Sequence, residues 1–169
     1  MATMTETPTR LGRHAQWLFA DYLGKIETCL GLLDERQLWQ RSGPHCNSIA
    51  NLVLHLEGNL SQWVLAGLGG ATYERARSAE FAARETAGRD ELLARLRETV
   101  TRCQEVAGGL REEELVQRRV IQGYQRDGFG ALLHAVEHMS YHTGQVVHIT
   151  KELLGGACEI DFYPHLKGT

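Results

Sequence analysis

Four stretches of the chain repeat apolar residues every three to four positions, and glycine-rich breaks separate them. This spacing predicts amphipathic helices, because 3.6 residues complete one helical turn. The predicted helices run from Arg10 to about Gln37, from Asn47 or Ser48 to about Ala66, from Asp90 to about Ala107, and from Asp127 or Gly128 to Leu154. Four such helices in 169 residues indicate an all-α four-helix bundle, which forms a single domain over residues 1–169.

Long connections separate the second, third and fourth predicted helices. Residues 71–87 are charged and predict a surface connection with room for one helical turn. Residues 110–115 predict a short turn of helix, and the β-rich, basic residues 116–125 predict an extended connection. These lengths permit a crossover between helices. Residues 1–9 are expected to form a loose tail, and residues 157–169 a packed coil.

Composition and charge exclude several classes of protein. The formal net charge of -3 provides no basic surface for nucleic acid or for an anionic membrane. No apolar run reaches the roughly 18 residues that a membrane span needs, and no signal peptide is expected at the N-terminus. The four cysteines are scattered, with no C-x-x-C pair. This pattern favours a reducing cytoplasm over a disulfide scaffold or a zinc ribbon.

The segment from His134 to His148 contains four of the eight histidines of the chain. His134, His138 and His142 recur at every fourth residue, which places all three on one face of the predicted helix. Two imidazoles at positions i and i+4 can bind one divalent metal ion from the same side. The spacing does not distinguish the pair His134/His138 from the pair His138/His142. His148 points away from this face.

The second predicted helix carries an uncharged polar stripe on one face: Ser48, Asn51, His55, Asn59 and Gln62. A solvent-exposed face usually includes lysine, arginine or acidic residues. One interpretation of the stripe is therefore an enclosed, wet cleft. The other is an ordinary amphipathic helix with His55 in solvent, and the pattern alone favours neither.

Together these residues resemble a known family. His55 on the second helix, followed by H-M-S-Y-H-T-G-Q at residues 138–145, is similar to the DinB/YfiT-like superfamily, whose members are regarded as metalloenzymes. The stretches N-S-I-A-N-L-V-L-H-L-E-G-N-L (47–60) and R-A-R-S-A-E-F (75–81) resemble a branch known mainly as a domain of unknown function. The resemblance extends from about residue 10 to residue 155, whereas the tail D-F-Y-P-H-L-K-G departs from it.

The resemblance implies a fold, a ligand set and an assembly. The fold is a four-helix bundle in up-down-down-up order with long crossover connections, and the assembly is commonly a homodimer. The implied metal ligands are His55, His138 and His142, which leaves His134 as a residue of the pocket. Because the superfamily includes thiol S-transferases and mycothiol-dependent isomerases, we expect a metal-dependent thiol S-transferase or hydrolase that acts on a small molecule.

Three neutral histidines leave an ion with an open coordination position, as in catalytic rather than structural zinc sites. Zinc is the first expectation, and nickel, iron, manganese or cobalt would accept the same ligands. The ion would activate water, or a low-molecular-weight thiol as cosubstrate, and His134 is the candidate helper for proton transfer. Five side chains are expected to orient the ligands or the substrate: Asn51, Asn59, Gln62, His134 and Gln145.

Two other interpretations of the histidines stay open. One is a bundle that binds a metal or another ligand without catalysis, in a stress response. The other is a polar seam inside the bundle that binds no metal. The second and fourth helices are also apolar on their far sides, more than one small core should need, and this favours a homodimer.

Overall fold

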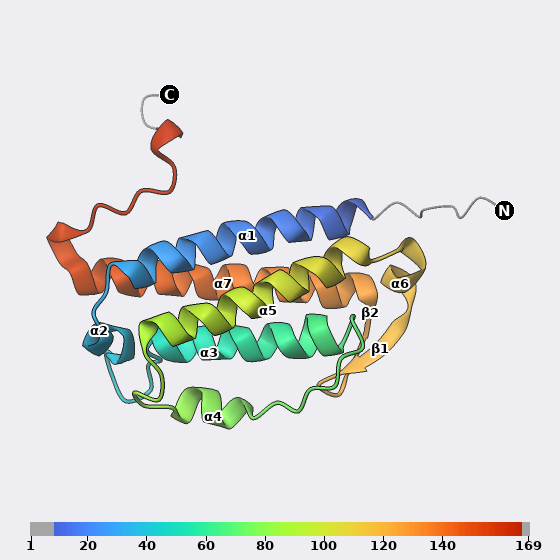
Figure 1. The fold of residues 1–169 in the computed structure, drawn as a ribbon, viewed down its shortest axis with the longest axis horizontal. Coiled ribbons are helices and arrows are strands. Elements are labelled where there is room, and N and C mark those ends of the chain that lie inside the picture. The colour runs from blue at the N-terminus through green and yellow to red at the C-terminus, as the bar shows by residue number, and fades with distance from the viewer. Residues whose placement is uncertain (1–8, 167–169) are drawn as a thin grey trace.

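Four long helices pack side by side in the computed structural model, which describes residues 9–166 (Figure 1). A π-helical segment, η1 (Ser61–Ala66), extends the second of them. The bundle helices are α1 (Arg10–Gly31), α3 (Ile49–Leu60), α5 (Arg89–Gly109) and α7 (Gly128–Leu154). The predicted all-α four-helix bundle is therefore confirmed, and the last three helices begin and end close to the predicted residues.

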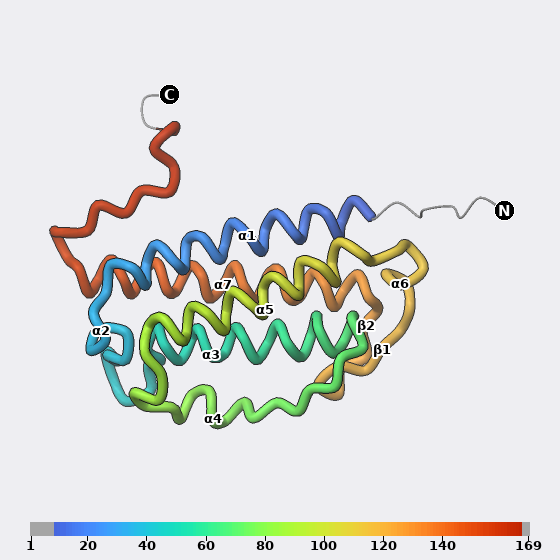
Figure 2. The backbone as a smooth tube through the Cα atoms, viewed as in Figure 1, coloured from blue at the N-terminus to red at the C-terminus, as the bar shows by residue number. Residues whose placement is uncertain are grey.

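The bundle helices run in the order up, down, down, up. Glu57 of α3 contacts Arg95 of α5, and Leu60, later in α3, contacts Cys103, later in α5, so these two helices are parallel. Gln16, early in α1, exchanges hydrogen bonds with Gln104, late in α5, so α1 is antiparallel to α5. The tube in Figure 2 shows that α7 also runs opposite to α3. Two parallel helices need a long connection between them, and residues 67–88 provide it.

The first helix ends before the predicted Gln37. It stops at Gly31, and a separate helix, α2 (Glu35–Trp39), follows. The side chain of Asp34 accepts the backbone N–H of Gln37, whose own side chain accepts the backbone N–H of Asp34. This reciprocal cap starts a new helix. The buried indole of Trp39 then donates to the main chain just before α5, so α2 anchors the end of the long connection.

Regular structure also divides the connection after α5. A short helix, α6 (Glu112–Val116), precedes an antiparallel hairpin of β1 (Arg118–Ile121) and β2 (Tyr124–Asp127). Gln122 and Gly123 form its turn, with φ angles of 52° and 77°. Two positive φ values are what a type I′ turn requires. The predicted extended connection is therefore a hairpin.

The two ends of the described chain pack differently. Residues 1–8 of the expected N-terminal tail lie outside the described residues, and Thr9 is not loose. Thr9 is 4% exposed, its hydroxyl accepts the N–H of Gly12, and its own N–H donates to the carbonyl of Leu110. After α7, the chain forms two short 3-10 helices, Gly155–Ala157 and Pro164–Leu166. Residues 167–169 lie outside the described residues.

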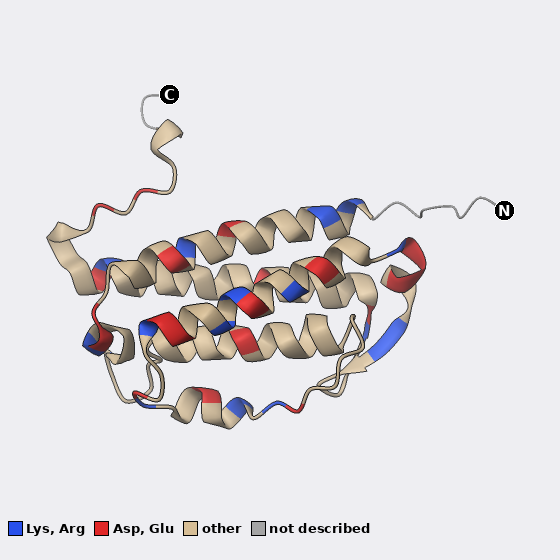
Figure 3. Ribbon diagram, in the orientation of Figure 1, with Lys and Arg blue, Asp and Glu red and all other residues tan. Residues whose placement is uncertain are grey.

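The polar stripe of α3 is enclosed rather than solvated. Asn51, His55 and Asn59 are each at most 3% exposed, and Glu57 is the one charged residue of α3 (Figure 3). The opposite face of α3 joins an apolar core to which all four bundle helices contribute. Of the two interpretations of the stripe, the structure therefore shows the enclosed one. No helix among residues 9–166 is long and apolar enough to cross a membrane.

Candidate metal centre

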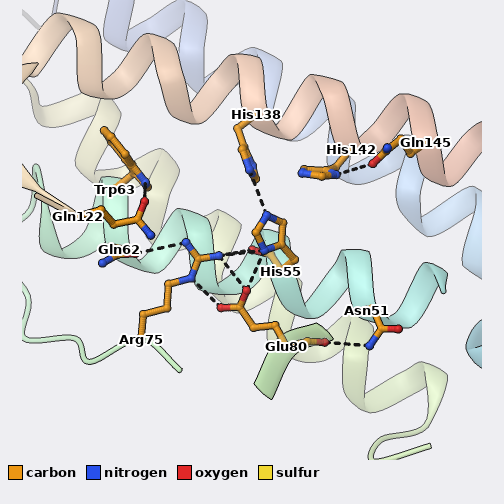
Figure 4. A network of polar contacts seen from close by, with 10 residues as sticks. All are labelled: Asn51, His55, Gln62, Trp63, Arg75, Glu80, Gln122, His138, His142 and Gln145. Atoms are coloured by element: carbon orange, nitrogen blue, oxygen red, sulfur yellow. Dashed lines mark hydrogen bonds and ion pairs between the residues drawn. The ribbon is translucent and has the colours of Figure 1, made fainter. Parts of the chain in front are cut away.

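Three histidine side chains meet between α3 and α7. His138 and His142 project from successive turns of α7, and His55 projects toward them from α3 (Figure 4). Each offers one ring nitrogen, and these three atoms lie within 4.8 Å of one another. The Nε2 atoms of His55 and His138 are 3.2 Å apart. Two ligand nitrogens of a tetrahedral ion with bonds of about 2.0–2.1 Å are about 3.3 Å apart, so this spacing fits one zinc-sized ion.

A buried ion pair holds His55 from the side that faces away from α7. Oε2 of Glu80 lies 2.8 Å from Nδ1 of His55, and Arg75 donates to both oxygens of Glu80, at 2.7 and 2.9 Å. The side chains of Arg75 and Glu80 are only 3% and 10% exposed. Because the carboxylate accepts the Nδ1 proton, Nε2 of His55 keeps its lone pair for an ion. Metal-binding histidines are commonly supported in this way.

A neighbour on its own helix holds His142 in the same tautomer. Nδ1 of His142 lies 2.6 Å from Oε1 of Gln145, so Nδ1 donates and Nε2 is free to bind an ion. His138 differs, because its buried Nδ1 has no hydrogen-bond partner among the described residues. Oδ1 of Asn59 is likewise buried and unpartnered.

Burial favours the neutral form of the α7 histidines, which is the form that binds metal. Loss of water around His138, reinforced by the neighbouring histidines, lowers its pKa to about 3. Burial also lowers the pKa of His142, against the opposing hydrogen bond of Gln145. At Glu80 burial acts to raise the pKa, but the hydrogen bonds from His55 and its arginine partner outweigh it, and the pKa is lowered. Neutral imidazoles beside an ionised carboxylate suit a cation.

Glu80 belongs to α4 (Arg77–Ala82), a short helix of the long connection, and hydrogen bonds fix α4 against α3. Nδ2 of Asn51 donates to the carbonyls of Glu80 and Ala83, at 2.8 and 3.1 Å. Arg41 donates to Oδ1 of Asn51 and to the main chain of α4, both at 2.6 Å. Asn51 therefore positions Glu80 through its backbone.

Gly58 provides the space in which the ion pair lies against α3. A Cβ atom at Gly58 would overlap the carboxylate of Glu80 and come within 3.0 Å of Nε of Arg75. Phe81, the next residue of α4, packs on His55 with ring centroids 4.6 Å apart. A glycine one turn after His55 is thus required for α4 to approach this closely.

An open cavity of about 730 Å³ lies beside the cluster. His55 and His138 form part of its wall, as do Trp63 and His134, whose ring centroids are 4.0 Å apart. The hairpin forms another part, and the indole N–H of Trp63 donates to Oε1 of Gln122 in the hairpin turn at 3.1 Å. A cavity of this size suits a small molecule.

The five residues predicted to support the ligands occupy different places. Gln145 bonds to His142, whereas Gln62 accepts a hydrogen bond from Arg75 at 3.3 Å. Asn59 and His134 line the cavity. Asn51 bonds to the main chain of α4, as described above.

The sequence patterns predict no role for Arg75 or Glu80. Both lie in the stretch R-A-R-S-A-E-F, which carried a family resemblance but no local sign of burial. Their partner is His55, which accepts a hydrogen bond from Arg75, 20 residues away, through its backbone carbonyl and contacts Glu80, 25 residues away, through Nδ1. Helical periodicity relates residues only a few positions apart, so it cannot predict a contact between residues this far apart in the sequence.

A family model described as a protein of unknown function (DUF1572) matches residues 11–160. The chain belongs to this family. The match spans all four bundle helices and both long connections. A comparison with curated proteins finds no match.

Solved structures share the fold at low sequence identity. YfiT from Bacillus subtilis, described as "a probable metal-dependent hydrolase with an unusual four-helix bundle topology", has 13% identity and a TM-score of 0.70, over 90% of this chain and 93% of that chain. A DinB-like protein from the same organism has 18% identity and a TM-score of 0.67, over 89% and 96%. A conserved protein from Enterococcus faecalis has 14% identity and a TM-score of 0.72, over 87% and 99%. These likenesses confirm the DinB/YfiT-like fold.

Proposed function

We propose that this protein is a metal-dependent enzyme of the hydrolase or thiol S-transferase type, in which His55, His138 and His142 hold one divalent ion. The observation that carries the proposal is the convergence of three ring nitrogens within 4.8 Å. Zinc is the preferred ion, and nickel, iron, manganese or cobalt would accept the same nitrogens. Since the described cluster comprises three ligands, a fourth position is left for a water molecule or a substrate.

When bound, such an ion supplies Lewis acidity to a water, thiol or carbonyl group in the cavity. Glu80 and Gln145 accept the Nδ1 protons of His55 and His142 and so keep both rings oriented. His134 is the group on the cavity wall best suited to accept a proton. Burial lowers its pKa, so its imidazole is neutral near pH 7.

Hydrolysis and thiol transfer differ in the nucleophile and not in the ligand set. YfiT, which has the same fold, is described as a probable metal-dependent hydrolase, and this favours esters and amides as the first substrates to test. The cavity of about 730 Å³ also has room for a low-molecular-weight thiol beside a small substrate.

A bundle that binds a metal or another ligand without catalysis is the second candidate. The observation in its favour is that no aspartate or glutamate of the described chain lines the cavity, so no carboxylate is in place as a general base. Such a protein would hold the ion with the same three histidines and show no turnover. Its role would be sequestration, in a stress response.

We also propose that the protein is a homodimer in a reducing cytoplasm. Phe129 and Leu133 of α7 are each 49% exposed, and Tyr141 is 63% exposed. Exposed apolar side chains on one helix often mark a contact between copies. The four free cysteines suit a reducing compartment. A monomer at every concentration in light scattering would contradict the dimer.

Elemental analysis of the untagged protein tests the metal site. Wild type should contain about one divalent ion per chain after reconstitution, and His55→Ala and His138→Ala should contain none. His148→Ala is the matched control, because His148 lies on the exposed face of α7. Metal-loaded protein should then turn over small esters or thiol acceptors and lose this activity with a chelator. A wild type without metal would overturn the proposal, and bound metal without turnover would favour the second candidate.

A further inference from the structure

We propose that the substrate carries an acidic group, a carboxylate or a phosphate, and that Arg77 and Arg126 bind this group in the cavity. The proposal rests on the proposed function only in placing the reacting end of the substrate at the three histidines. The anion site itself is built from two side chains that neither bind the ion nor orient its ligands.

The wall of the cavity is cationic. Three arginines line it: Arg75, Arg77 and Arg126. No acidic side chain of residues 9–166 lines it. This local excess of positive charge contrasts with the net charge of -3 of the whole chain. A concave surface lined by one sign of charge concentrates ligands of the opposite sign.

The three arginines are not equivalent. Arg75 is 3% exposed and is neutralised by Glu80. Arg77 and Arg126 are exposed, and no ion pair joins either of them to a carboxylate in the described part of the chain. Arg126 donates one hydrogen bond, from Nη1 to the carbonyl of Gln125 at 2.9 Å. Two guanidinium groups are thus left with N–H donors and uncompensated charge.

Aromatic rings hold both of these arginines in place. The guanidinium of Arg77 lies 4.9 Å from the ring centroid of Phe81, and that of Arg126 lies 5.5 Å from the ring centroid of Tyr124. A guanidinium over a ring face still presents its N–H edge to a planar acid. Restricting these side chains before binding reduces the entropy that a ligand must remove.

The position of Arg77 ties the anion site to the histidines. Phe81, which carries the guanidinium of Arg77 on its ring, packs on His55 with centroids 4.6 Å apart. Only one ring layer therefore separates this arginine from a proposed ligand of the ion. Arg126 acts from the hairpin and is close enough to His134 for its charge to contribute to lowering the pKa of His134. A small acid could thus place its reacting group at the cluster and its charge between the arginines.

Binding of simple probes tests the site without turnover. Titration calorimetry would compare succinate and inorganic phosphate with succinamide, the neutral counterpart of succinate, on metal-loaded wild type and on Arg77→Gln/Arg126→Gln. Arg118→Gln/Lys151→Gln is the matched control, because it removes the same charge from exposed positions outside the cavity. We expect binding of an acid probe by wild type and by the control, with affinity reduced about tenfold or more in the arginine variant.

Metal-free protein separates this proposal from the proposed function. Acid binding should persist in the His138→Ala variant and in chelator-treated wild type, and it should still depend on the two arginines. That result would support the anion site even if no metal were found. Three results would overturn it: no acid binding by wild type, equal binding of succinamide, or acid binding that requires the ion and is unchanged in the arginine variant.

Discussion

The two long connections of the bundle reach the same cavity in opposite ways. The connection before α5, residues 67–88, presses a buried ion pair against α3, and nearly every polar group of that pair has a partner. The connection after α5, residues 110–127, sends out a hairpin whose side chains are mostly exposed, as Val120 (71%) and Tyr124 (56%) illustrate. The first supports the histidines from behind, and the second forms the wall that a ligand would meet.

This difference indicates how the two segments should respond to substitution. A buried, paired network resists change, because removing one member leaves its partner without water or a counter-charge. An exposed hairpin tolerates change, because solvent replaces what is lost. Substitutions before α5 should therefore alter both folding and metal binding, whereas substitutions in the hairpin should alter ligand binding alone.

The largest loss of stability is expected for Glu80→Ala. The variant leaves Arg75 buried and unpaired, and breaking a buried pair in this way typically costs about 3–5 kcal/mol. Chemical denaturation of the metal-free protein would measure the loss. Glu80→Gln keeps an acceptor for His55 and should cost less, while lowering metal affinity about 10- to 100-fold. Glu74→Ala is the control, since Glu74 is exposed in the same connection. Equal stability of Glu80→Ala and the control would refute a supporting role for the ion pair.

Asn51→Ala should have the next largest effect. Asn51 is fully buried, and its amide satisfies two carbonyls of the α4 segment and the guanidinium of Arg41. Leaving buried polar groups unpaired costs about 1–3 kcal/mol. Because α4 would also loosen, amides of residues 77–83 should exchange faster with solvent hydrogen. Unchanged exchange in this segment, measured by mass spectrometry, would show that other contacts fix α4.

In Gly58→Ala, two effects on stability oppose each other, and the size of each is known. Alanine is favoured over glycine in a helix by about 1 kcal/mol, but here the methyl group overlaps Glu80, and overpacking costs about 1–3 kcal/mol. We expect a net loss of about 1 kcal/mol, together with weaker metal binding. Gly24→Ala in α1 is the control, since nothing lies within 4 Å of its Cβ position, and it should be neutral or stabilising. Thermal unfolding of the two variants would be measured in parallel. Stabilisation of both variants would contradict the steric explanation.

The smallest effect is expected in the hairpin. Val120→Ser removes an apolar side chain that is already 71% exposed, so stability should change by no more than about 0.5 kcal/mol. Metal content by elemental analysis should equal that of wild type. A large loss of stability would mean that the hairpin is covered in solution, as by a second copy of the chain.

Local signals explain how much of the fold could be predicted. Apolar spacing and glycine breaks identified all four bundle helices, because both act within a few residues. The early end of the first helix had a local signal as well, since Asp34 and Gln37 form a capping box that the apolar pattern obscured. The hairpin was predicted only as extended chain, because strand pairing depends on a turn with two positive φ angles.

In the candidate site, too, some features follow from the local sequence and others depend on tertiary contacts. By itself the sequence determined that three histidines share one face of α7 and that the stripe around His55 is uncharged, since both follow from helical geometry. Only the tertiary structure decided that this stripe is enclosed, that the ring of His134 packs against Trp63, and that Glu80 reaches His55 across 25 residues. The physical reason is the distance along the chain over which each signal acts. Periodicity records which face of a helix avoids water, whereas burial and ion pairing depend on which distant segment comes to cover that face.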